Sequence, residues 1–411
     1  MRAVHVVSHN ETRPVILIFT NYYLPGYRGG GPIRTIANLV ETLGDEFAFY
    51  IVTMDRDLGD LCAYDSIAVD NWNQIGKAHV YYASPLTRSL RNIVRLMRNT
   101  PHDVLYLNSF FNTKFTLTPL IAHKLKMVQN KPVVLAPRGE FSEGAFKLKR
   151  WKKTPFTRLV RWLGIYDDVI WHASTPYELA EIQRFMKVQS SRIRIACNIA
   201  VAPDKVAFHA EPQKADQMGP ITAKGLRICF LSRISPKKNL DFALRVLAQT
   251  RSSIQFHIYG PKESPAYWQE CEVLISQLPP NVQVSYGGSV HNSQVCTTIA
   301  KYDLFFVPSR GENFGHVFIE ALSVGVPILV SDQTPWRNLK AQNLGWDISL
   351  TQPVDFVSAV EEAAQFDQAM RAKIRAHCIS FAHKHASDSS SLDMNRNLFI
   401  NAISSKSVAD Q

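Results

Sequence analysis

Two carboxylates, Glu312 and Glu320, stand eight residues apart around a loop that the sequence predicts to open a helix. The apolar run 304–307 is typical of a buried strand, and a helix is then expected to begin near Phe314 and to end before Gly325. Glu320 falls nearly two turns into that helix, where a carboxylate can accept two hydrogen bonds from a sugar diol. Glu312 stays on the loop. Taken alone, the simpler interpretation is two solvated acids.

The start of this helix offers a second kind of contact. The first backbone N–H groups of a helix lack intrahelical partners and lie at the positive end of its dipole, which suits a phosphate group or the oxygens of a sugar. The residues concerned are Asn313, Phe314, Gly315 and His316. The segment therefore predicts an anion or sugar contact beside the two glutamates.

This segment resembles the Glu-x7-Glu motif of retaining glycosyltransferases with the GT-B fold, in the family called GT4 or glycosyl transferases group 1. Arg233 and Lys238 follow the predicted strand 226–231 and are similar to the family's Arg-x4-Lys element, whose cations hold the donor diphosphate. Two fixed positive charges at this spacing can pair with a pyrophosphate. Asn239 stands where the family commonly has glycine, so a slightly altered turn is expected.

The resemblance implies a role for each residue of the segment. Glu320 is expected to clamp the ribose of a nucleotide, and Glu312 is expected to lie nearer the reacting sugar. His316 matches a common variant of the helix start and is a candidate contact to a sugar hydroxyl.

Two further predicted strands, 254–259 and 282–286, end at glycines. In the family such strand ends face the donor, and the backbone near the second receives the base, which assigns Gly260 and Val290 to donor binding. A glycine at a strand end permits close backbone approach to a ligand, but Gly260 could also be a turn residue.

Near the N-terminus, the predicted strand 15–19 leads to a run of three glycines before a helix with Pro32 in its first turn. The run is neither a GxGxxG fingerprint nor a Walker loop. It resembles the family's glycine loop, which closes on the donor diphosphate and sugar, so Gly30 and Gly31 are predicted to bind the donor.

After the predicted strand 133–136, many family members carry a histidine that faces the anomeric carbon. This chain has Arg138 instead, in a Pro-Arg-Gly variant that occurs in a subgroup of the family. Arg138 is therefore the candidate for contacting the donor phosphate or the acceptor, and Glu140 is an alternative ligand of acceptor hydroxyls. His172, beside another strand, is interpreted as structural. The catalytic set comprises Glu312, Arg233, Lys238 and Arg138.

Short apolar strands alternate with helical periodicity twice along the 411 residues, as in parallel sheets with crossover helices. We expect an α/β protein of the GT-B class, with two Rossmann-like domains whose parallel sheets face each other across a donor-binding cleft. The predicted parts are an acceptor domain at 1–208, a linker at 209–224, a nucleotide-sugar donor domain at 225–386, and, at 387–411, a helix that crosses back to the first domain, plus a tail.

The six cysteines are scattered without any CxxC pair, which is typical of free thiols in a reducing compartment. No apolar run reaches the ~18 residues that a membrane span needs, and residues 1–13 lack the core of a signal peptide. A cytoplasmic enzyme is expected.

The positive charge is concentrated in the first half, with a net charge of +10 for residues 1–200 and +1 for the remainder. A basic cluster in residues 144–166 contains no acid and alternates with Trp and Leu side chains. Such a segment suits the anionic inner leaflet of a membrane, and the alternative is a helix that packs its aromatics in the core. Nucleic acid is disfavoured because no binding module accompanies the cluster. The cluster runs from Lys147 to Leu163 through Lys149, Arg150, Trp151, Lys152, Lys153, Arg158, Leu159, Arg161 and Trp162.

The triplet Asp55-Arg56-Asp57 has the DxD pattern with which a different glycosyltransferase fold binds a divalent metal. It lies far in sequence from the donor elements, so we predict no metal site, and no cofactor apart from the nucleotide sugar as substrate.

These patterns predict a retaining, metal-independent glycosyltransferase that moves a sugar from a nucleotide-diphosphate donor to a glycan or lipid-linked acceptor by front-face displacement. The alternatives with the same fold are a sugar phosphorylase, a sugar-phosphate synthase or a nucleotide-sugar epimerase. A catalytically silent nucleotide-sugar or glycan-binding protein is the alternative from another class. The sequence specifies neither the nucleotide nor the sugar.

Overall fold

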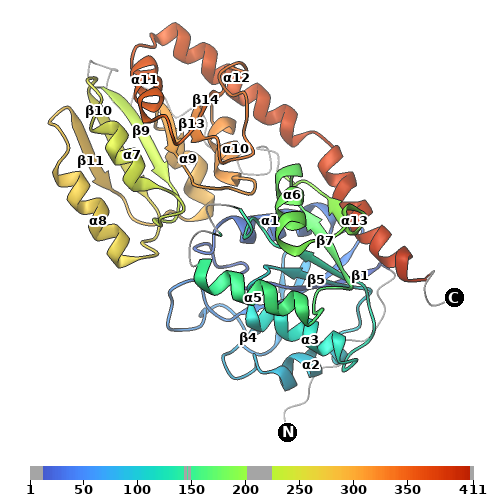
Figure 1. The fold of residues 1–411 in the computed structure, drawn as a ribbon. Helices are drawn as coiled ribbons and strands as arrows, with labels where there is room; N and C mark the ends of the chain where they lie inside the picture. The colour runs from blue at the N-terminus through green and yellow to red at the C-terminus, as the bar shows by residue number, and fades with distance from the viewer. Residues whose placement is uncertain (1–12, 143–145, 147–149, 201–224, 408–411) are drawn as a thin grey trace. The chain divides into compact units, whose positions relative to one another are not determined.

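The computed structural model describes residues 13–407, apart from 143–145, 147–149 and 201–224. The chain divides into two compact units (Figure 1). Unit 1 comprises Met1–Ile199 and Ser389–Gln411, and unit 2 comprises Ala200–Asp388. The linker predicted at 209–224 lies outside the described residues.

The described residues of unit 1 form a sheet of eight strands, parallel throughout except for the antiparallel edge pair β3 and β4. Alternate residues of β1 belong to two different hydrophobic clusters, Leu17 and Phe19 to one and Ile16 and Ile18 to the other. The sheet is therefore buried on both faces, as expected for a doubly wound fold. In spatial order the strands are β3 (Trp72–Ile75), β4 (Ala78–Ala83), β2 (Ala48–Met54), β1 (Val15–Phe19), β5 (Val104–Asn108), β6 (Val133–Ala136), β7 (Val169–Ala173) and β8 (Ile193–Ile195).

The helices of unit 1, apart from the last one, lie between these strands in the chain. The first follows the glycine run and has proline in its first turn, as predicted, and it buries Ile33, Ile36, Val40 and Leu43. The helices are α1 (Gly31–Leu43), α2 (Leu90–Asn99), α3 (Thr118–Lys124), α5 (Arg150–Trp162), α6 (Pro176–Met186) and α13 (Ser390–Ser407).

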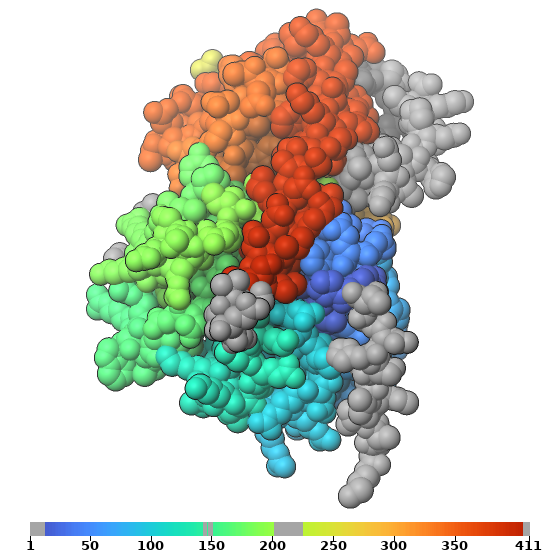
Figure 2. Space-filling view, turned by 90° about the vertical axis from the view of Figure 1, so that its right-hand side faces the viewer, coloured from blue at the N-terminus to red at the C-terminus, as the bar shows by residue number. Residues whose placement is uncertain are grey.

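Helix α13 belongs to unit 1 although it follows unit 2 in the chain. Its buried Phe399 packs edge-on against Phe47 and Tyr106, and Arg396 forms an ion pair with Glu46. Figure 2 shows it as the red strip between the green and the blue parts of unit 1. The chain end therefore completes the core of the first unit.

Unit 2 contains a sheet of six parallel strands. In spatial order they are β11 (Val282–Tyr286), β10 (Ile254–Tyr259), β9 (Leu226–Leu231), β12 (Leu304–Val307), β13 (Ile328–Ser331) and β14 (Gly345–Ile348). The helices are α7 (Leu240–Leu247), α8 (Pro265–Ser276), α9 (Val295–Ile299), α10 (His316–Ser323), α11 (Pro353–Ala364) and α12 (Gln368–Ala386).

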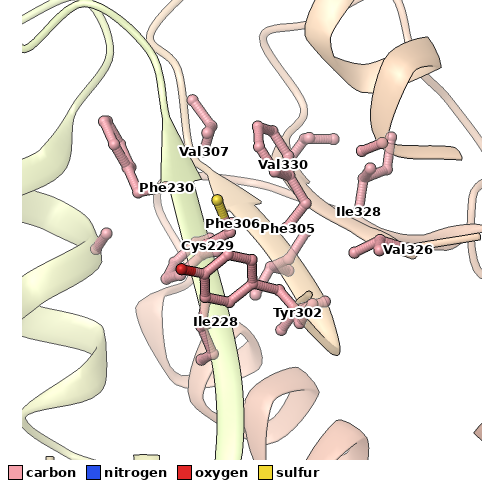
Figure 3. Close-up of a cluster of buried hydrophobic side chains, with 14 of the residues drawn as sticks. Ile228, Cys229, Phe230, Tyr302, Phe305, Phe306, Val307, Val326, Ile328 and Val330 are labelled. Atoms are coloured by element: carbon pink, nitrogen blue, oxygen red, sulfur yellow. The ribbon is translucent and has the colours of Figure 1, made fainter. Parts of the chain in front are cut away.

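The centre of unit 2 is packed from the two middle strands. Figure 3 shows side chains of β9, including Ile228 and Phe230, beside strands β12 and β13, and Phe305 and Val330 of these strands are also fully buried. Burial of one such side chain stabilises the fold by about 1.5–3 kcal/mol. The near-continuous apolar runs that predicted these strands thus reflect burial on both faces of a parallel sheet.

Among the described residues, no helix is long and apolar enough to cross a bilayer. The cysteines form no disulfide, and Cys229, Cys271 and Cys378 are buried.

Candidate functional site

Four of the predicted site residues of unit 2 lie on loops that follow three neighbouring strands. Arg233 and Lys238 follow β9, Gly260 follows β10, and Glu312 follows β12. Because β10, β9 and β12 are adjacent and parallel, their carboxyl ends lie at the same edge of the sheet. Ligands of open α/β sheets bind at such an edge.

Lys238 and Glu312 form an ion pair with an Nζ–Oε2 distance of 2.5 Å, although they are 74 residues apart in sequence. Their side chains are only 12% and 16% exposed. Burial acts to raise the pKa of Glu312, but the positive charges of Lys238, Lys237 and Arg233 outweigh it, so the pKa is lowered from its ordinary value. Glu312 is therefore ionised at neutral pH, within a group of three cations.

Arg233 pairs with a carboxylate that the sequence analysis did not select, Glu263, at an Nη1–Oε2 distance of 3.2 Å. The two side chains are 31% and 39% exposed. Such a solvent-exposed pair contributes about 0–1 kcal/mol, so an anionic ligand can replace Glu263 at small cost. Glu263 follows the Gly260-Pro261 turn, and only the pairing of β9 with β10 brings it to Arg233.

Asn239 has a left-handed backbone, with φ 64° and ψ 39°. Glycine adopts this conformation readily, and asparagine tolerates it better than most residues. Asn239 can therefore form a turn of the kind that glycine would form at this position. The buried side chain also adds contacts that glycine lacks. Its Nδ2 donates to the carbonyl of Pro308 at 3.0 Å, and its Oδ1 accepts from Nε of Arg310 at 2.8 Å. Asn239 thus fastens the Lys238 turn to the loop that carries Glu312.

Helix α10 begins at His316, two residues after Phe314, near which the sequence predicted its start. The physical reason is Gly315, which precedes the helix with a φ of 80° and ψ of 63°, outside the helical region. Glu320 is consequently the fifth residue of the helix, in its second turn, closer to the N-terminus than predicted. Gly315, as the N-cap residue, makes no side-chain cap hydrogen bond. Asn313 and Phe314 lie on the preceding loop, next to Glu312.

The loop before α10 is supported by an aromatic residue that the sequence analysis missed. Nε1 of Trp336 donates to the carbonyl of Phe314 at 2.6 Å, and the Phe314 ring lies 4.7 Å from that of His316 and 6.3 Å from that of His385, between centroids. These residues come from separate loops and helices, so no spacing in the sequence could have indicated the contact.

Gly260 is required by packing. Its φ is 129°, and a Cβ at this position would lie 1.8 Å from the carbonyl oxygen of Ser232. Its N–H donates to the carbonyl of Gly288 at 2.8 Å, which joins the ends of β10 and β11. The interpretation of Gly260 as a turn residue thus has a direct structural reason. Donor contact by Gly260 stays a prediction. The same holds for Val290, which is partly buried against the core.

In unit 1, Gly30 is the N-cap of α1 with φ 74°, and Gly31, exposed, is the first residue of the helix. The DxD triplet follows β2 in the same unit. Asp55 pairs with the guanidinium of Arg56, and Asp57 accepts backbone N–H groups. No group of three or more potential metal ligands occurs within the described part of the chain.

Arg138 lies at the carboxyl end of β6, where its side chain enters a polar cluster of unit 1. Nε donates to Asn108 at 3.0 Å, Nη1 to Asn198 at 2.8 Å and Nη2 to the hydroxyl of Tyr106 at 2.6 Å. The acceptors follow or belong to β5 and β8, so the guanidinium joins several strand ends. The structure thus gives Arg138 a fixed position at the sheet edge, and its contact with a substrate stays a prediction.

His172 supports the same cluster. Its Nε2 is 2.8 Å from the carbonyl of Ala196 and must donate, so Nδ1 accepts from the hydroxyl of Tyr106 at 2.7 Å. Burial and the nearby charge of Arg138 lower the pKa of His172 to about 3. The imidazole is therefore neutral, which supports its interpretation as structural.

Glu140 accepts hydrogen bonds from the hydroxyl of Ser109 at 2.7 Å and from the N–H groups of Phe110 at 2.6 Å and Phe111 at 3.1 Å. Burial raises the pKa of Glu140 against the opposing effect of these donors. The carboxylate is thus engaged in holding the loop after β5, which weakens its alternative role as a ligand of acceptor hydroxyls.

The basic segment divides its apolar residues between core and solvent. Phe146 and Val160 are buried, whereas Trp151 is 74% and Trp162 is 81% exposed. Leu159 and Leu163 are about half exposed. Lys147 and Lys149 lie outside the described residues. The alternative in which all aromatics pack in the core is therefore wrong for the two tryptophans.

Two Rossmann-like units with parallel sheets, one of them with acids and bases gathered at the carboxyl ends of its strands, define the GT-B class of fold. The sequence model of the family "Glycosyl transferases group 1" matches residues 213–376, which span most of unit 2. Residues 213–376 of this chain are thus similar to the glycosyl transferases group 1 family.

Three known proteins are similar to this chain over at least half of its length. It is 26% identical over 305 residues to a 41.2 kDa protein in the cps region of Klebsiella pneumoniae, covering 74% of this chain and 78% of that one. It is 24% identical over 229 residues to D-inositol 3-phosphate glycosyltransferase of Jonesia denitrificans, covering 52% of this chain and 53% of the relative. The structure of Anabaena HepE, in complex with UDP and glucose, has a TM-score of 0.67 at 13% identity, covering 97% and 100%.

Proposed function

We propose that this protein is a retaining GT4 glycosyltransferase that moves a sugar from a nucleotide-diphosphate donor to a glycan or lipid-linked acceptor. The observation that carries the proposal is the buried Lys238–Glu312 pair, with Arg233 and Lys237 near the same carboxylate. Arg233, Lys237 and Lys238 bring three positive charges to this part of the sheet edge, where Glu312 pairs with Lys238 and Glu263 with Arg233. A diphosphate, with its two or more negative charges, is the natural ligand of such a group.

The relatives support a sugar-nucleotide substrate in this general class. Anabaena HepE was solved with UDP and glucose, and the Klebsiella protein is encoded in a cps region. Both likenesses support the class of the substrate.

In the proposed reaction, the bond from the anomeric carbon to the diphosphate oxygen breaks while the acceptor oxygen forms its bond on the same face of the sugar. The acceptor proton passes to an oxygen of the departing diphosphate, which leaves with the bonding electron pair. Arg233 and Lys238 stabilise the negative charge that grows on the leaving group. Preorganised donors of this kind are each worth about 10²–10³ in rate in other enzymes.

The two glutamates have separate roles in this scheme. Glu320 accepts hydrogen bonds from the ribose diol. Glu312, held ionised by Lys238, accepts hydrogen bonds from sugar hydroxyls and keeps the Lys238 ammonium in place. A carboxylate that already bonds to a cation is a weak nucleophile, which favours direct displacement over a covalent intermediate.

We further propose that α5 contacts an anionic membrane surface. Its exposed Trp151 and Trp162 lie among the side chains of Lys152, Arg158 and Arg161, and the ammonium of Lys152 lies 4.6 Å from the Trp151 ring centroid. Tryptophan with flanking cations is the pattern of interfacial helices. Such contact would bring the enzyme to a lipid-linked acceptor.

The test of the proposed activity uses Glu320→Ala and Lys238→Ala. Each variant is expected to lose transfer by about 10²-fold or more, since each removes a group that binds the donor or its developing charge. Donor classes are first ranked by thermal shift with UDP-, GDP-, ADP- and CMP-sugars. A ligand that binds the folded chain raises its stability, and the increase grows with the ratio of ligand concentration to dissociation constant.

Circular dichroism and thermal unfolding serve as controls for folding. Transfer at the wild-type rate by both variants would contradict the assigned site. Donor binding without transfer or hydrolysis would instead favour a silent binding protein.

A further inference from the structure

The loop that precedes the glycine run of unit 1 is held in place by the second acid of the DxD triplet. Oδ2 of Asp57 accepts the N–H of Tyr27 at 2.8 Å and that of Arg28 at 3.0 Å, and Oδ1 accepts the N–H of Leu58 at 2.8 Å. Asp57 is 4% exposed. Hydrogen bonds from N–H groups to a carboxylate are stronger than those between neutral groups. The acid therefore uses both oxygens to bind backbone.

The bonds continue from Tyr27 and Arg28 into the glycine run. The N–H of Gly30 donates to the carbonyl of Tyr27 at 3.1 Å, and the N–H of Ile33 donates to the carbonyl of Gly30 at 3.1 Å. A chain of short contacts thus joins Asp57 to the first turn of α1. Any displacement of Tyr27 would be transmitted to Gly30 and to the helix N-terminus.

The residues after Asp57 enclose the same loop from the other side. Arg28 forms an ion pair with Asp60, and a Cβ on Gly26 would lie 2.2 Å from the hydroxyl of Tyr64 and 3.1 Å from Cγ of Asp57. Only glycine at position 26 lets the loop approach Asp57 and Tyr64 this closely. The hydroxyl of Tyr64 is buried and has no hydrogen-bond partner in the described structure, so it contributes packing alone.

We propose that Asp57 is a positioning residue: its carboxylate fixes the backbone of Tyr27 and Arg28, and thereby holds the glycine loop in the conformation that binds the oxygens of the nucleotide sugar. The proposal rests on the proposed function, because the contact of Gly30 and Gly31 with the donor is part of it. It assigns to the DxD triplet a role that needs no metal. In this arrangement the glycine loop is preformed before the donor arrives.

The proposal is tested with Asp57→Ala and the conservative Asp57→Asn in the full chain. Alanine removes all three hydrogen bonds. Asparagine keeps one acceptor oxygen but loses the charge and presents N–H groups where Oδ1 now accepts. We expect amide hydrogen exchange at Tyr27 and Arg28, and tryptic cleavage after Arg28, to accelerate most in the alanine variant and less in the asparagine variant.

Steady-state kinetics distinguish a positioning role of Asp57 from a general loss of structure. The donor KM is expected to rise by about tenfold in Asp57→Ala, with a smaller change in kcat, because the loop then samples conformations that do not bind. Tyr64→Phe, which removes an unpartnered hydroxyl beside the same loop, is the matched control expected to keep the wild-type exchange rate and KM.

Unchanged exchange at Tyr27 and Arg28, or an unchanged donor KM, in Asp57→Ala would overturn the proposal. If the alanine variant fails to fold, the same two measurements on Asp57→Asn decide it. A wild-type chain that binds none of the nucleotide sugars would refute the proposed function together with this inference. Normal donor binding in the Asp57 variants would refute the inference alone.

Discussion

Single residues in this protein have roles that depend on partners far away in the sequence. Glu312 is ionised because Lys238, Lys237 and Arg233 surround it, against the effect of burial. Arg233 is held by Glu263, and Asn239 bonds to Pro308 and Arg310, which lie 69 and 71 residues further along the chain. The residue types alone permitted these roles without requiring them.

Asn239 gives a prediction at this scale. Asn239→Gly keeps the left-handed backbone but loses the bonds to Pro308 and Arg310, which should cost about 1–3 kcal/mol of unfolding free energy at about 0.5–1.5 kcal/mol per hydrogen bond. Asn239→Ala should lose about 1–2 kcal/mol more, because alanine is strained at positive φ. Denaturant unfolding of the three proteins measures both effects. A glycine variant as stable as wild type would show that the side-chain bonds contribute nothing.

At the scale of elements, helix ends and strand ends decide what can bind. The parallel pairing of β10, β9 and β12 gathers loops from three places in the sequence at one edge of unit 2. The start of α10 is set by Gly315, and the backbone before it is held by Trp336. The loops are therefore supported by elements that make no predicted contact with substrate.

Helix α5 gives the prediction for this scale. Lys152→Gln with Arg158→Gln should weaken binding to anionic vesicles roughly 30-fold, at about 1 kcal/mol for each cation. Trp151→Ala with Trp162→Ala should weaken it as well, by removing the apolar anchors. Co-sedimentation with phosphatidylcholine vesicles, with and without phosphatidylglycerol, measures the effect.

A matched control comes from α2, which presents Arg91 and Arg95 to solvent but has no exposed tryptophan. Replacing these two arginines by glutamine should leave vesicle binding at the wild-type level. An equal loss from the α2 and α5 pairs would indicate a general effect of net charge and would contradict a specific role for α5.

At the scale of the whole molecule, the stability of unit 1 is linked to pH through His172. In the folded chain the pKa of His172 is about 3, below its ordinary value of 6.5. Between these two pH values the unfolded chain binds a proton at His172 and the folded chain does not. The contribution of neutral His172 to the free energy of unfolding is fully present above about pH 6.5 and is lost as the pH falls toward 3. The unfolding free energy should therefore decrease by up to about 1.4 kcal/mol per pH unit in this interval.

His172→Gln removes this titration while other groups, including the buried His102, still titrate in both proteins. Denaturant unfolding at pH 7, 6 and 5 should show the wild type losing its advantage over the variant as the pH falls. A difference that stays constant over this range would mean that His172 is not the group responsible.

The sequence by itself determined the local elements and the class of fold. The strands at 15–19 and 304–307 were predicted with the bounds that the structure has, because a strand buried on both faces requires a continuous apolar run. The strand at 254–259 was also predicted with its observed bounds, and alternate residues of it are buried. The helix after the glycine run was predicted from its periodicity and its proline. The motif residues Arg233, Lys238, Glu312 and Glu320 were selected by spacing, and their binding of a donor stays a prediction.

Only the tertiary structure decided which side chains meet. The pair of Lys238 with Glu312, the support of Phe314 by Trp336 and the hold of Asp57 on Tyr27 each join segments between 22 and 74 residues apart. Sequence periodicity reports which face of an element is buried, but partners across loops depend on strand order and on the path of each loop. For this reason Glu312 and Glu320 could be found from the sequence, whereas the network of cations around Glu312 could not.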